Sequence, residues 1–166
     1  MALPASPASA AGGDRIAVGD SVMLGAKYPL KDRGFAIVDA DESRQAGTAP
    51  GLLRKRGTGL PANVVVHLGT NGTFPIETCH DVVDTAGPHR SVYFLTIHAE
   101  RSWVKNNNKM LRRCDGDYAA DRVRIIDWDW AASRHPEWLY ADGIHLRPEG
   151  AKAYARIVDL AVDSAQ

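Results

Sequence analysis

The segment RIAVGDSV, residues 15–22, joins a short apolar run to a glycine and two polar residues. The run Arg15–Val18 shows no polar alternation, which is typical of a β-strand buried on both faces. Gly19 then permits a sharp turn, and Ser21 stands where the next element would begin. This order of features predicts a strand that delivers a polar loop to the edge of a buried sheet.

Four further β-branched runs follow the first, at intervals of about 16 to 25 residues. They are Phe35–Val38, Val64–Leu68, Val92–Ile97 and Val123–Ile126. Each interval has room for a helix and two loops, so the pattern predicts βαβ units, a five-stranded parallel sheet and the α/β class. We expect helices over 76–86, over 104–113 and from Pro148 onward, and only short, broken helix in the Pro- and Gly-containing stretch 46–60.

Length and charge limit the kind of protein this is. The 166 residues correspond to about one domain, which we place at 14–166. Lys and Arg balance Asp and Glu at 20 each, which makes a dedicated nucleic-acid-binding protein a poor candidate. Residues 1–13 are almost all Ala, Pro, Ser and Gly and contain no basic residue, so we expect a flexible tail or linker stub rather than a signal peptide. No apolar run approaches the length of a membrane span.

Chemically useful side chains follow the predicted strands, at the edge where ligands bind in open parallel sheets. Ser21 follows the first strand, Asn71 lies in the Gly69–Gly72 turn after the third, and Asp142 and His145 precede the last helix. A serine needs a base to act as a nucleophile, and a carboxylate can orient an imidazole base. An amide N–H₂ can stabilise an oxyanion. Together these roles complete the set that acyl transfer requires.

Each piece also has a purely structural explanation. Asp20 or Ser21 would serve as a helix N-cap, Asn71 would fit an ordinary Asn-Gly turn, and Asp142 with His145 would cap the last helix. His67 lies inside the third strand pattern and is expected to be a core histidine rather than a site residue. The combination of the pieces, each at a strand end, favours the catalytic interpretation.

The three blocks Gly19-Asp20-Ser21, Gly69-Thr70-Asn71-Gly72 and Asp142-Gly143-Ile144-His145 resemble those of the SGNH, or GDSL-like, hydrolases. The resemblance implies a three-layer, flavodoxin-like α/β sandwich with strand order 2-1-3-4-5. It also implies Ser21 as nucleophile, His145 as base and Asp142 as its orienting carboxylate. The oxyanion hole would consist of the backbone N–H of Ser21, the amide of Asn71 and one further backbone donor.

That third donor departs from the family pattern. The family usually places a glycine after the second strand, whereas this chain has Ser43 in a loop without glycine until Gly47. We assign the role to the backbone N–H of Ser43. With this loop, the chain is similar to the extracytoplasmic catalytic domain of bacterial peptidoglycan O-acetyltransferases, which follows a membrane acyltransferase domain.

The resemblance implies acetyl transfer from a donor to a cell-wall glycan through a serine acyl-enzyme, outside the cytoplasm. Two alternatives stay open: an esterase acting on carbohydrates or small esters, and a non-catalytic glycan-binding module of the same fold. Arg44, His98 and Trp103 are candidate substrate-binding residues. Cys79 and Cys114 would be either free thiols or one disulfide. No spacing indicates a metal or nucleotide site, and we expect no cofactor and no nucleic-acid partner.

Overall fold

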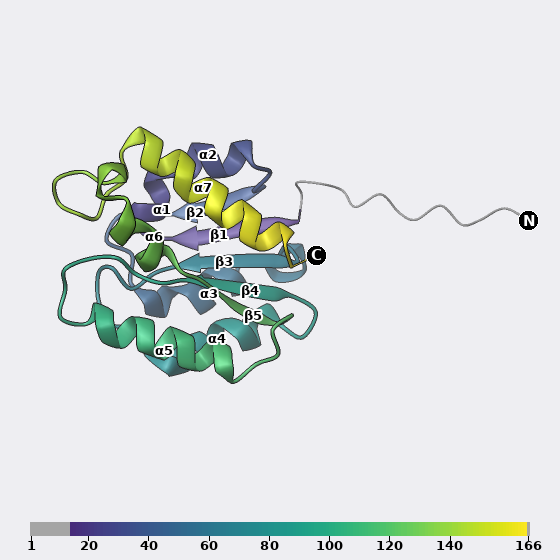
Figure 1. Ribbon diagram of the computed structural model, residues 1–166. Helices are drawn as coiled ribbons and strands as arrows, with labels where there is room; N and C mark the ends of the chain where they lie inside the picture. The colour runs from purple at the N-terminus through teal and green to yellow at the C-terminus, as the bar shows by residue number, and fades with distance from the viewer. Residues whose placement is uncertain (1–13, 166) are drawn as a thin grey trace, which may run out of the picture.

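The computed structural model describes residues 14–165, so the predicted tail at 1–13 lies outside the described residues. It contains five parallel strands in the order β2-β1-β3-β4-β5, and Figure 1 shows helices on both sides of the sheet. The strands are β1 (Arg15–Gly19), β2 (Ile37–Ala40), β3 (Asn63–His67), β4 (Ser91–Leu95) and β5 (Val123–Ile126). The predicted α/β class, parallel sheet and strand order are confirmed.

Within residues 14–165, seven helices and three short 3₁₀ turns lie between the strands or follow the last strand. The helices are α1 (Ser21–Gly25), α2 (Lys27–Asp32), α3 (Ala49–Arg54), α4 (Ile76–Ala86), α5 (Val104–Gly116), α6 (Trp128–Arg134) and α7 (Pro148–Asp163). The 3₁₀ turns are Ala46–Thr48, Gly57–Gly59 and Pro136–Trp138. The predicted helices at 76–86, at 104–113 and from Pro148 are present, and the stretch 46–60 is short and broken as expected.

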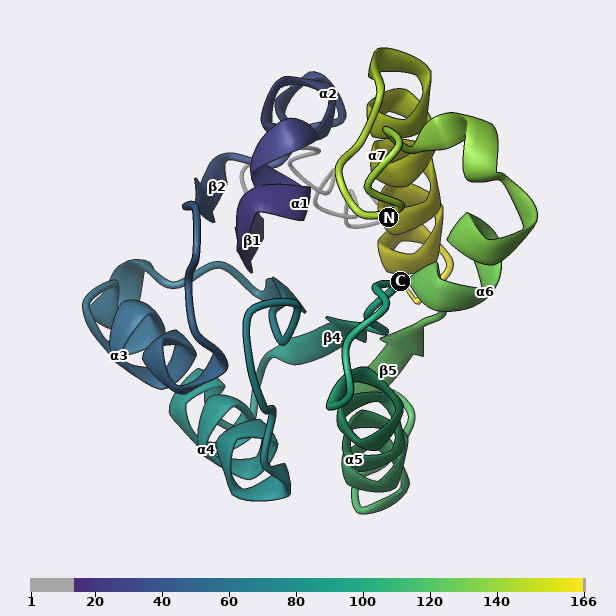
Figure 2. The same ribbon diagram turned by 90° about the vertical axis from the view of Figure 1, so that its left-hand side faces the viewer.

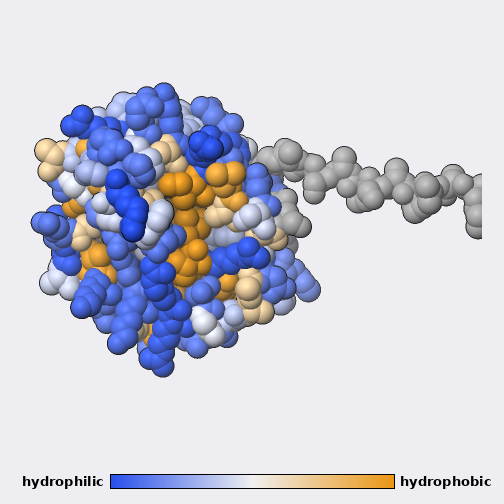
Figure 3. All heavy atoms as spheres, in the orientation of Figure 1, coloured by the Kyte–Doolittle hydropathy of each residue, from blue (hydrophilic) through white to orange (hydrophobic). Residues whose placement is uncertain are grey.

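The strands read as continuous apolar runs because both faces of the sheet are covered. In β3, Val64 and Val66 pack with α3, α4 and α5, whereas Val65 packs with α1, α2, α6 and α7. Successive side chains of a strand point to opposite faces, so each strand contributes to two separate cores. Figure 3 shows the outer surface on the side of α7 as mainly hydrophilic, with a band of hydrophobic residues across its middle.

One strand begins later than its apolar run predicts. The run Phe35–Val38 predicts a strand from Phe35, whereas β2 starts at Ile37. Gly34 has a φ of 85°, and the chain turns there before Phe35 places its ring in the core. Phe35 is therefore apolar because it is buried, although it precedes the hydrogen-bonded ladder.

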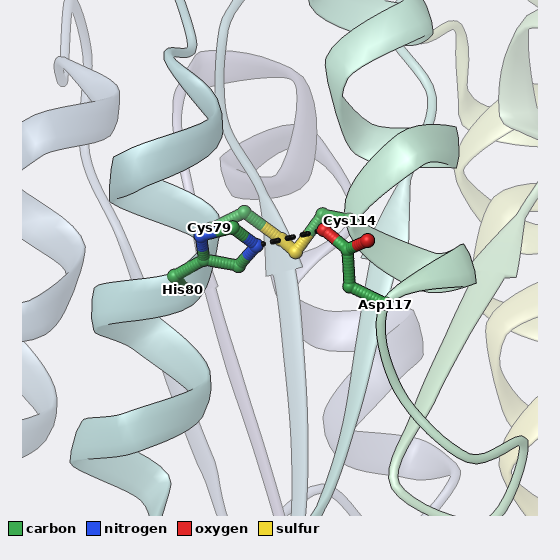
Figure 4. The surroundings of a disulfide bond; sticks show 4 residues. All are labelled: Cys79, His80, Cys114 and Asp117. Atoms are coloured by element: carbon green, nitrogen blue, oxygen red, sulfur yellow. Dashed lines mark hydrogen bonds and ion pairs between the residues drawn. A yellow bond between two sulfur atoms is a disulfide. The ribbon is translucent and has the colours of Figure 1, made fainter.

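Cys79 of α4 and Cys114 of α5 form a disulfide, which decides between the two states predicted for them. Both residues are fully buried in the core beneath these two helices. Figure 4 shows the bridge with His80 and Asp117 beside it, whose Nε2 and Oδ2 atoms lie 3.0 Å apart. The pair joins the same two helices at the surface.

Candidate active site

The polar loops meet at the edge of the sheet where the strands end, the edge that faces the viewer in Figure 2. β1 ends at Gly19, and an added Cβ there would lie 2.5 Å from Cβ of Met23, so only glycine fits. Asp20 caps α1, its carboxylate accepting a hydrogen bond from the Val22 N–H at 3.0 Å. The N-cap role thus belongs to Asp20, and the Ser21 side chain is left for other contacts.

Ser21, His145 and Asp142 form one hydrogen-bonded chain. Ser21 Oγ lies 3.0 Å from His145 Nε2, and His145 Nδ1 lies 2.6 Å from Asp142 Oδ2. The sequence separation between Ser21 and His145 is 124 residues, so only the fold brings them together. The arrangement has the geometry by which a base removes a hydroxyl proton while a carboxylate orients the base.

The Asp142 carboxylate is held ionised by its own loop. Burial acts to raise the pKa of Asp142, but hydrogen bonds from the His145 ring and from the backbone N–H groups of Ile144 and His145 outweigh it and bring the pKa to about 2. Asp142 therefore carries a full negative charge at neutral pH and accepts from the ring N–H of His145.

The loop that carries Asp142 and His145 is tied to itself and to α7. The Tyr140 N–H donates to the His145 carbonyl at 2.8 Å, and the Arg147 N–H donates to the Trp138 carbonyl at 2.8 Å. An added Cβ on Gly150 of α7 would lie 2.1 Å from the same Trp138 carbonyl, so the helix and the loop approach closely. These contacts fix the backbone of the loop from which the imidazole of His145 projects.

Three potential hydrogen-bond donors belong to residues that line one cavity. Ser21, Ser43, Asn71 and His145 line a cavity of about 550 Å³. Among the hydrogen bonds within residues 14–165, none uses the backbone N–H of Ser21 or of Ser43, and the Asn71 amide makes one long contact of 3.4 Å with the Arg44 carbonyl. In that part of the chain the two backbone donors are free of partners, and the Asn71 amide has a second N–H available beyond its long contact, so all three are suited to an oxyanion.

Ser43 has a φ of 56°, the one positive φ of a non-glycine residue within 14–165. This left-handed conformation favours glycine, which is the residue that the family pattern usually has here. Gln45 braces the loop, because its side-chain amide donates to the carbonyls of Ser43 at 3.3 Å and of Asn71 at 3.0 Å. Gln45 therefore connects the two loops that carry the outer donors.

The other candidate residues lie around this centre in different ways. The Arg44 guanidinium turns back toward the sheet, where it hydrogen-bonds Asp39 Oδ1 at 2.9 Å and the Gly19 carbonyl at 3.3 Å. Trp103 donates its indole N–H to the Gly69 carbonyl at 3.2 Å. Both side chains thus support the loops of the site rather than line the cavity beside Ser21. His98 lines a second hollow together with Asp142, and its Nδ1 lies 2.7 Å from Asp129 Oδ1.

Asn107 of α5 is a residue that the sequence motifs do not single out. It is fully buried, and its amide donates to the carbonyls of Gly69 at 3.0 Å and of Gly72 at 2.8 Å and accepts from the Phe74 N–H at 2.8 Å. It therefore holds the turn that carries Asn71. The available signal is the run Asn106–Asn108 inside a helix, since asparagine is a weak helix former.

His67 is fully buried, as expected for a core histidine, with Nδ1 2.8 Å from the hydroxyl of Tyr154. Burial lowers the pKa of His67, so its ring stays neutral. Within residues 14–165, no group of three or more His, Cys, Asp or Glu side chains could hold a metal ion. In that same part of the chain, no helix is long and apolar enough to cross a membrane.

No family model matches the chain. It is 31% identical over 150 residues to the peptidoglycan O-acetyltransferase OatA of Listeria monocytogenes, an alignment that covers 86% of this chain and 23% of that protein. The chain is homologous to one part of proteins named peptidoglycan O-acetyltransferase. It spans about a quarter of the length of these curated relatives.

Two solved structures share the fold of the chain. The C-terminal catalytic domain of the O-acetyltransferase OatA from Streptococcus pneumoniae superposes with a TM-score of 0.81 at 22% identity, covering 93% of this chain and 95% of that one. A lipolytic protein of the G-D-S-L family from Veillonella parvula superposes with a TM-score of 0.67 at 13% identity, covering 89% and 96%. The resemblance predicted from the three sequence blocks is confirmed, and the fold is that of the GDSL-type hydrolases.

Proposed function

We propose that this O-acetyltransferase homologue transfers acetyl groups to hydroxyls of a cell-wall glycan through an acetyl-serine intermediate. The observation that carries the proposal is the Ser21–His145–Asp142 chain of hydrogen bonds at 3.0 and 2.6 Å, beside a cavity lined by Ser43 and Asn71. The relatives named peptidoglycan O-acetyltransferase supply the substrate class.

In the first half-reaction, Ser21 Oγ attacks the carbonyl carbon of an acetyl ester while His145 Nε2 takes the hydroxyl proton. The negative charge that develops on the carbonyl oxygen is stabilised by the N–H groups of Ser21 and Ser43 and by the Asn71 amide. The ester C–O bond then breaks, His145 returns the proton to the leaving alcohol, and acetyl-Ser21 remains. Asp142 stays ionised and stabilises the imidazolium throughout.

In the second half-reaction, a glycan hydroxyl attacks acetyl-Ser21. His145 takes the proton of that hydroxyl and then gives it to the departing Ser21 Oγ. The acetyl group ends on the acceptor as a new ester, and the enzyme returns to its starting state.

Acetyl transfer to water is the second candidate function. The side chains of Asp142 and His145 are 45% and 47% exposed, so water reaches the site and can replace the glycan hydroxyl. The ratio of transfer to hydrolysis separates the two. It is measured with an activated acetyl ester as donor, in the presence and absence of cell-wall oligosaccharides.

The non-catalytic alternative predicts binding of glycan without turnover. The 3.0 Å contact between Ser21 and His145 favours catalysis over such a module. The test is incubation with an activated acetyl ester, proteolysis and mass spectrometry, which should find the acetyl group on Ser21. An acetyl group on another residue, or turnover at the wild-type rate in Ser21→Ala, would refute the assignment.

The same proposal includes the domain organisation of the parent protein and its location in the cell. Residues 14–166 form the catalytic domain, and the parent protein carries a membrane acyltransferase domain that supplies the acetyl donor. The short span relative to the curated relatives supports this division. The Cys79–Cys114 disulfide supports a location outside the cytoplasm, where disulfides persist.

A further inference from the structure

Glu42 places a carboxylate at the cavity that holds Ser21. Of the residues within 14–165 that line this cavity of about 550 Å³, Glu42 is the one with a carboxylate side chain. It directly precedes Ser43, so its Cα lies about 3.8 Å from the Cα of a proposed oxyanion donor. A charge on Glu42 therefore acts at short range on an ester that occupies the cavity.

The loop that carries Glu42 is held in place by backbone contacts. The Glu42 N–H donates to Asp41 Oδ1 at 2.9 Å, and the Asp41 N–H donates to the Gly19 carbonyl at 3.2 Å. On the other side of Glu42, the Gln45 amide donates to the Ser43 carbonyl at 3.3 Å. These contacts keep Glu42 at the wall of the cavity although its side chain is exposed.

The charge of Glu42 is not offset by a neighbouring cation. Within residues 14–165 the Glu42 carboxylate forms no ion pair, and the nearby cation Arg44 is paired instead with Asp39 at 2.9 Å. The described residues that line the cavity include no Lys or Arg. Asp142, which is hydrogen-bonded to the His145 ring, adds a second carboxylate of the same sign. The carboxylates at this site are therefore in excess, although the chain as a whole has no net charge.

We propose that Glu42 makes the cavity selective against anionic acetyl donors, so that the donor is an uncharged ester. The proposal rests on the proposed function and adds to it the chemical class of the donor. Charges interact over about 8 Å at physiological ionic strength, so a negative group on a small bound donor is repelled by Glu42. Repulsion of this kind is a common way in which a site rejects the wrong ligand. Acetyl phosphates belong to the rejected class.

The test compares three acetyl donors that differ in charge. They are para-nitrophenyl acetate, which is neutral, the same ester with a carboxylate on its ring, and the cationic thioester acetylthiocholine. The test variant is Glu42→Gln, which removes the charge and keeps the size of the side chain. The control is Asp121→Asn, which removes one exposed carboxylate just before β5, at the opposite edge of the sheet.

The quantity to compare is the ratio of kcat/KM between two donors, because an effect of Glu42 on the catalytic groups themselves is common to both. In Glu42→Gln the ratio of the anionic to the neutral donor should rise about 2- to 5-fold at low salt, the range for exposed charge pairs. The ratio of the cationic to the neutral donor should fall by a similar factor. Both changes should shrink as salt is added, and Asp121→Asn should keep the wild-type ratios.

Binding without turnover provides a second measurement. In Ser21→Ala, which lacks the proposed nucleophile, nuclear magnetic resonance shifts of the Ser43 N–H report the affinity for each donor. Affinity should decrease from the cationic to the neutral to the anionic donor, and this order should be lost when Glu42→Gln is added.

Unchanged ratios and affinities in Glu42→Gln would overturn the proposal, and so would an equal change in Asp121→Asn. Circular dichroism checks that each variant is folded. The proposed function fails on a different result, the absence of acetyl-Ser21 and of ester turnover in the wild type, which leaves the order of affinities in Ser21→Ala as the test of Glu42.

Discussion

The disulfide between Cys79 and Cys114 makes a quantitative prediction about stability. Its two cysteines are 35 residues apart, and a cross-link that closes a loop of this length restricts the unfolded chain. The loop-entropy relation gives about 4 kcal/mol of stabilisation at 25 °C. For a chain of this size, about 2–4 °C of Tm per kcal/mol corresponds to a decrease of roughly 8–16 °C when the bridge is removed.

The variant to measure is Cys79→Ala with Cys114→Ala, because alanine introduces no buried hydroxyl. Urea unfolding of the wild type, with and without reductant, is compared with unfolding of the double variant. The wild type should lose stability when reduced, and the variant should not respond to reductant. Neither cysteine lines the cavity that holds Ser21, so turnover of a small ester at 25 °C should change little.

Two results would refute this reasoning. One is a loss of less than about 1 kcal/mol in the double variant, which would mean that the unfolded chain gains little freedom. The other is an unchanged unfolding midpoint in wild-type protein whose thiols have been shown by labelling to be reduced. Near-ultraviolet circular dichroism of the variant checks that its native packing is retained.

Three further predictions concern the site. Ser43→Ala should keep turnover within about tenfold of the wild type, whereas Ser43→Pro should lower turnover by about 10²–10³-fold, because proline removes the backbone N–H and cannot adopt a φ of 56°. Circular dichroism on both variants checks that they are folded. Equal loss of turnover in two folded variants would mean that Ser43 acts through its hydroxyl and not through its backbone N–H. Asn107→Ala leaves the Phe74 N–H without its partner and should destabilise the fold by about 1–3 kcal/mol. It should also lower kcat at least tenfold, whereas Asn108→Ala, which loses contacts to Ile97 instead, should keep kcat; equal kcat in the two variants would contradict the positioning role. Because the folded pKa of Asp142 is depressed, its contribution to stability is present above its ordinary value of about 4 and is lost as pH falls toward about 2. Thermal unfolding of Asp142→Asn between these pH values should therefore show a shallower decline than the wild type, and parallel declines would be inconsistent with the depressed pKa.

The sheet could be predicted from the sequence because each strand is buried on both faces. Strands such as β3, with Val64–Val66 between two cores, lack polar alternation and stand out from their surroundings. The order of the strands depends on long-range pairing, which periodicity does not encode. The family resemblance is therefore what predicts the order 2-1-3-4-5. The start of α1 was expected from the N-cap candidates Asp20 and Ser21, but helices α2 and α6 were not predicted, since at six and seven residues they carry too little periodicity.

The candidate site shows a similar division. Ser21, Asn71, Asp142 and His145 follow strands or precede α7, so the topology alone predicts that they meet. The direction of a long side chain depends on its neighbours in space, which is why the inward turn of Arg44 toward Asp39 was not foreseen. The supporting contacts of Gln45 and Asn107 join loops more than 25 residues away in sequence. No local pattern marks Gln45, and the asparagine run 106–108 marks Asn107 only as an unusual helix residue, without indicating its partners.

The 124-residue interval between Ser21 and His145 has a consequence for how activity would arise during synthesis and export. The chain emerges from its N-terminus, so the nucleophile leaves the ribosome or the translocation channel long before its base. A chain cut short anywhere before Asp142 would display a serine hydroxyl with no activating imidazole. On the proposed mechanism, reactivity toward acetyl esters therefore appears only when almost the whole polypeptide has been synthesised and exported. Incomplete chains would not react with acetyl esters.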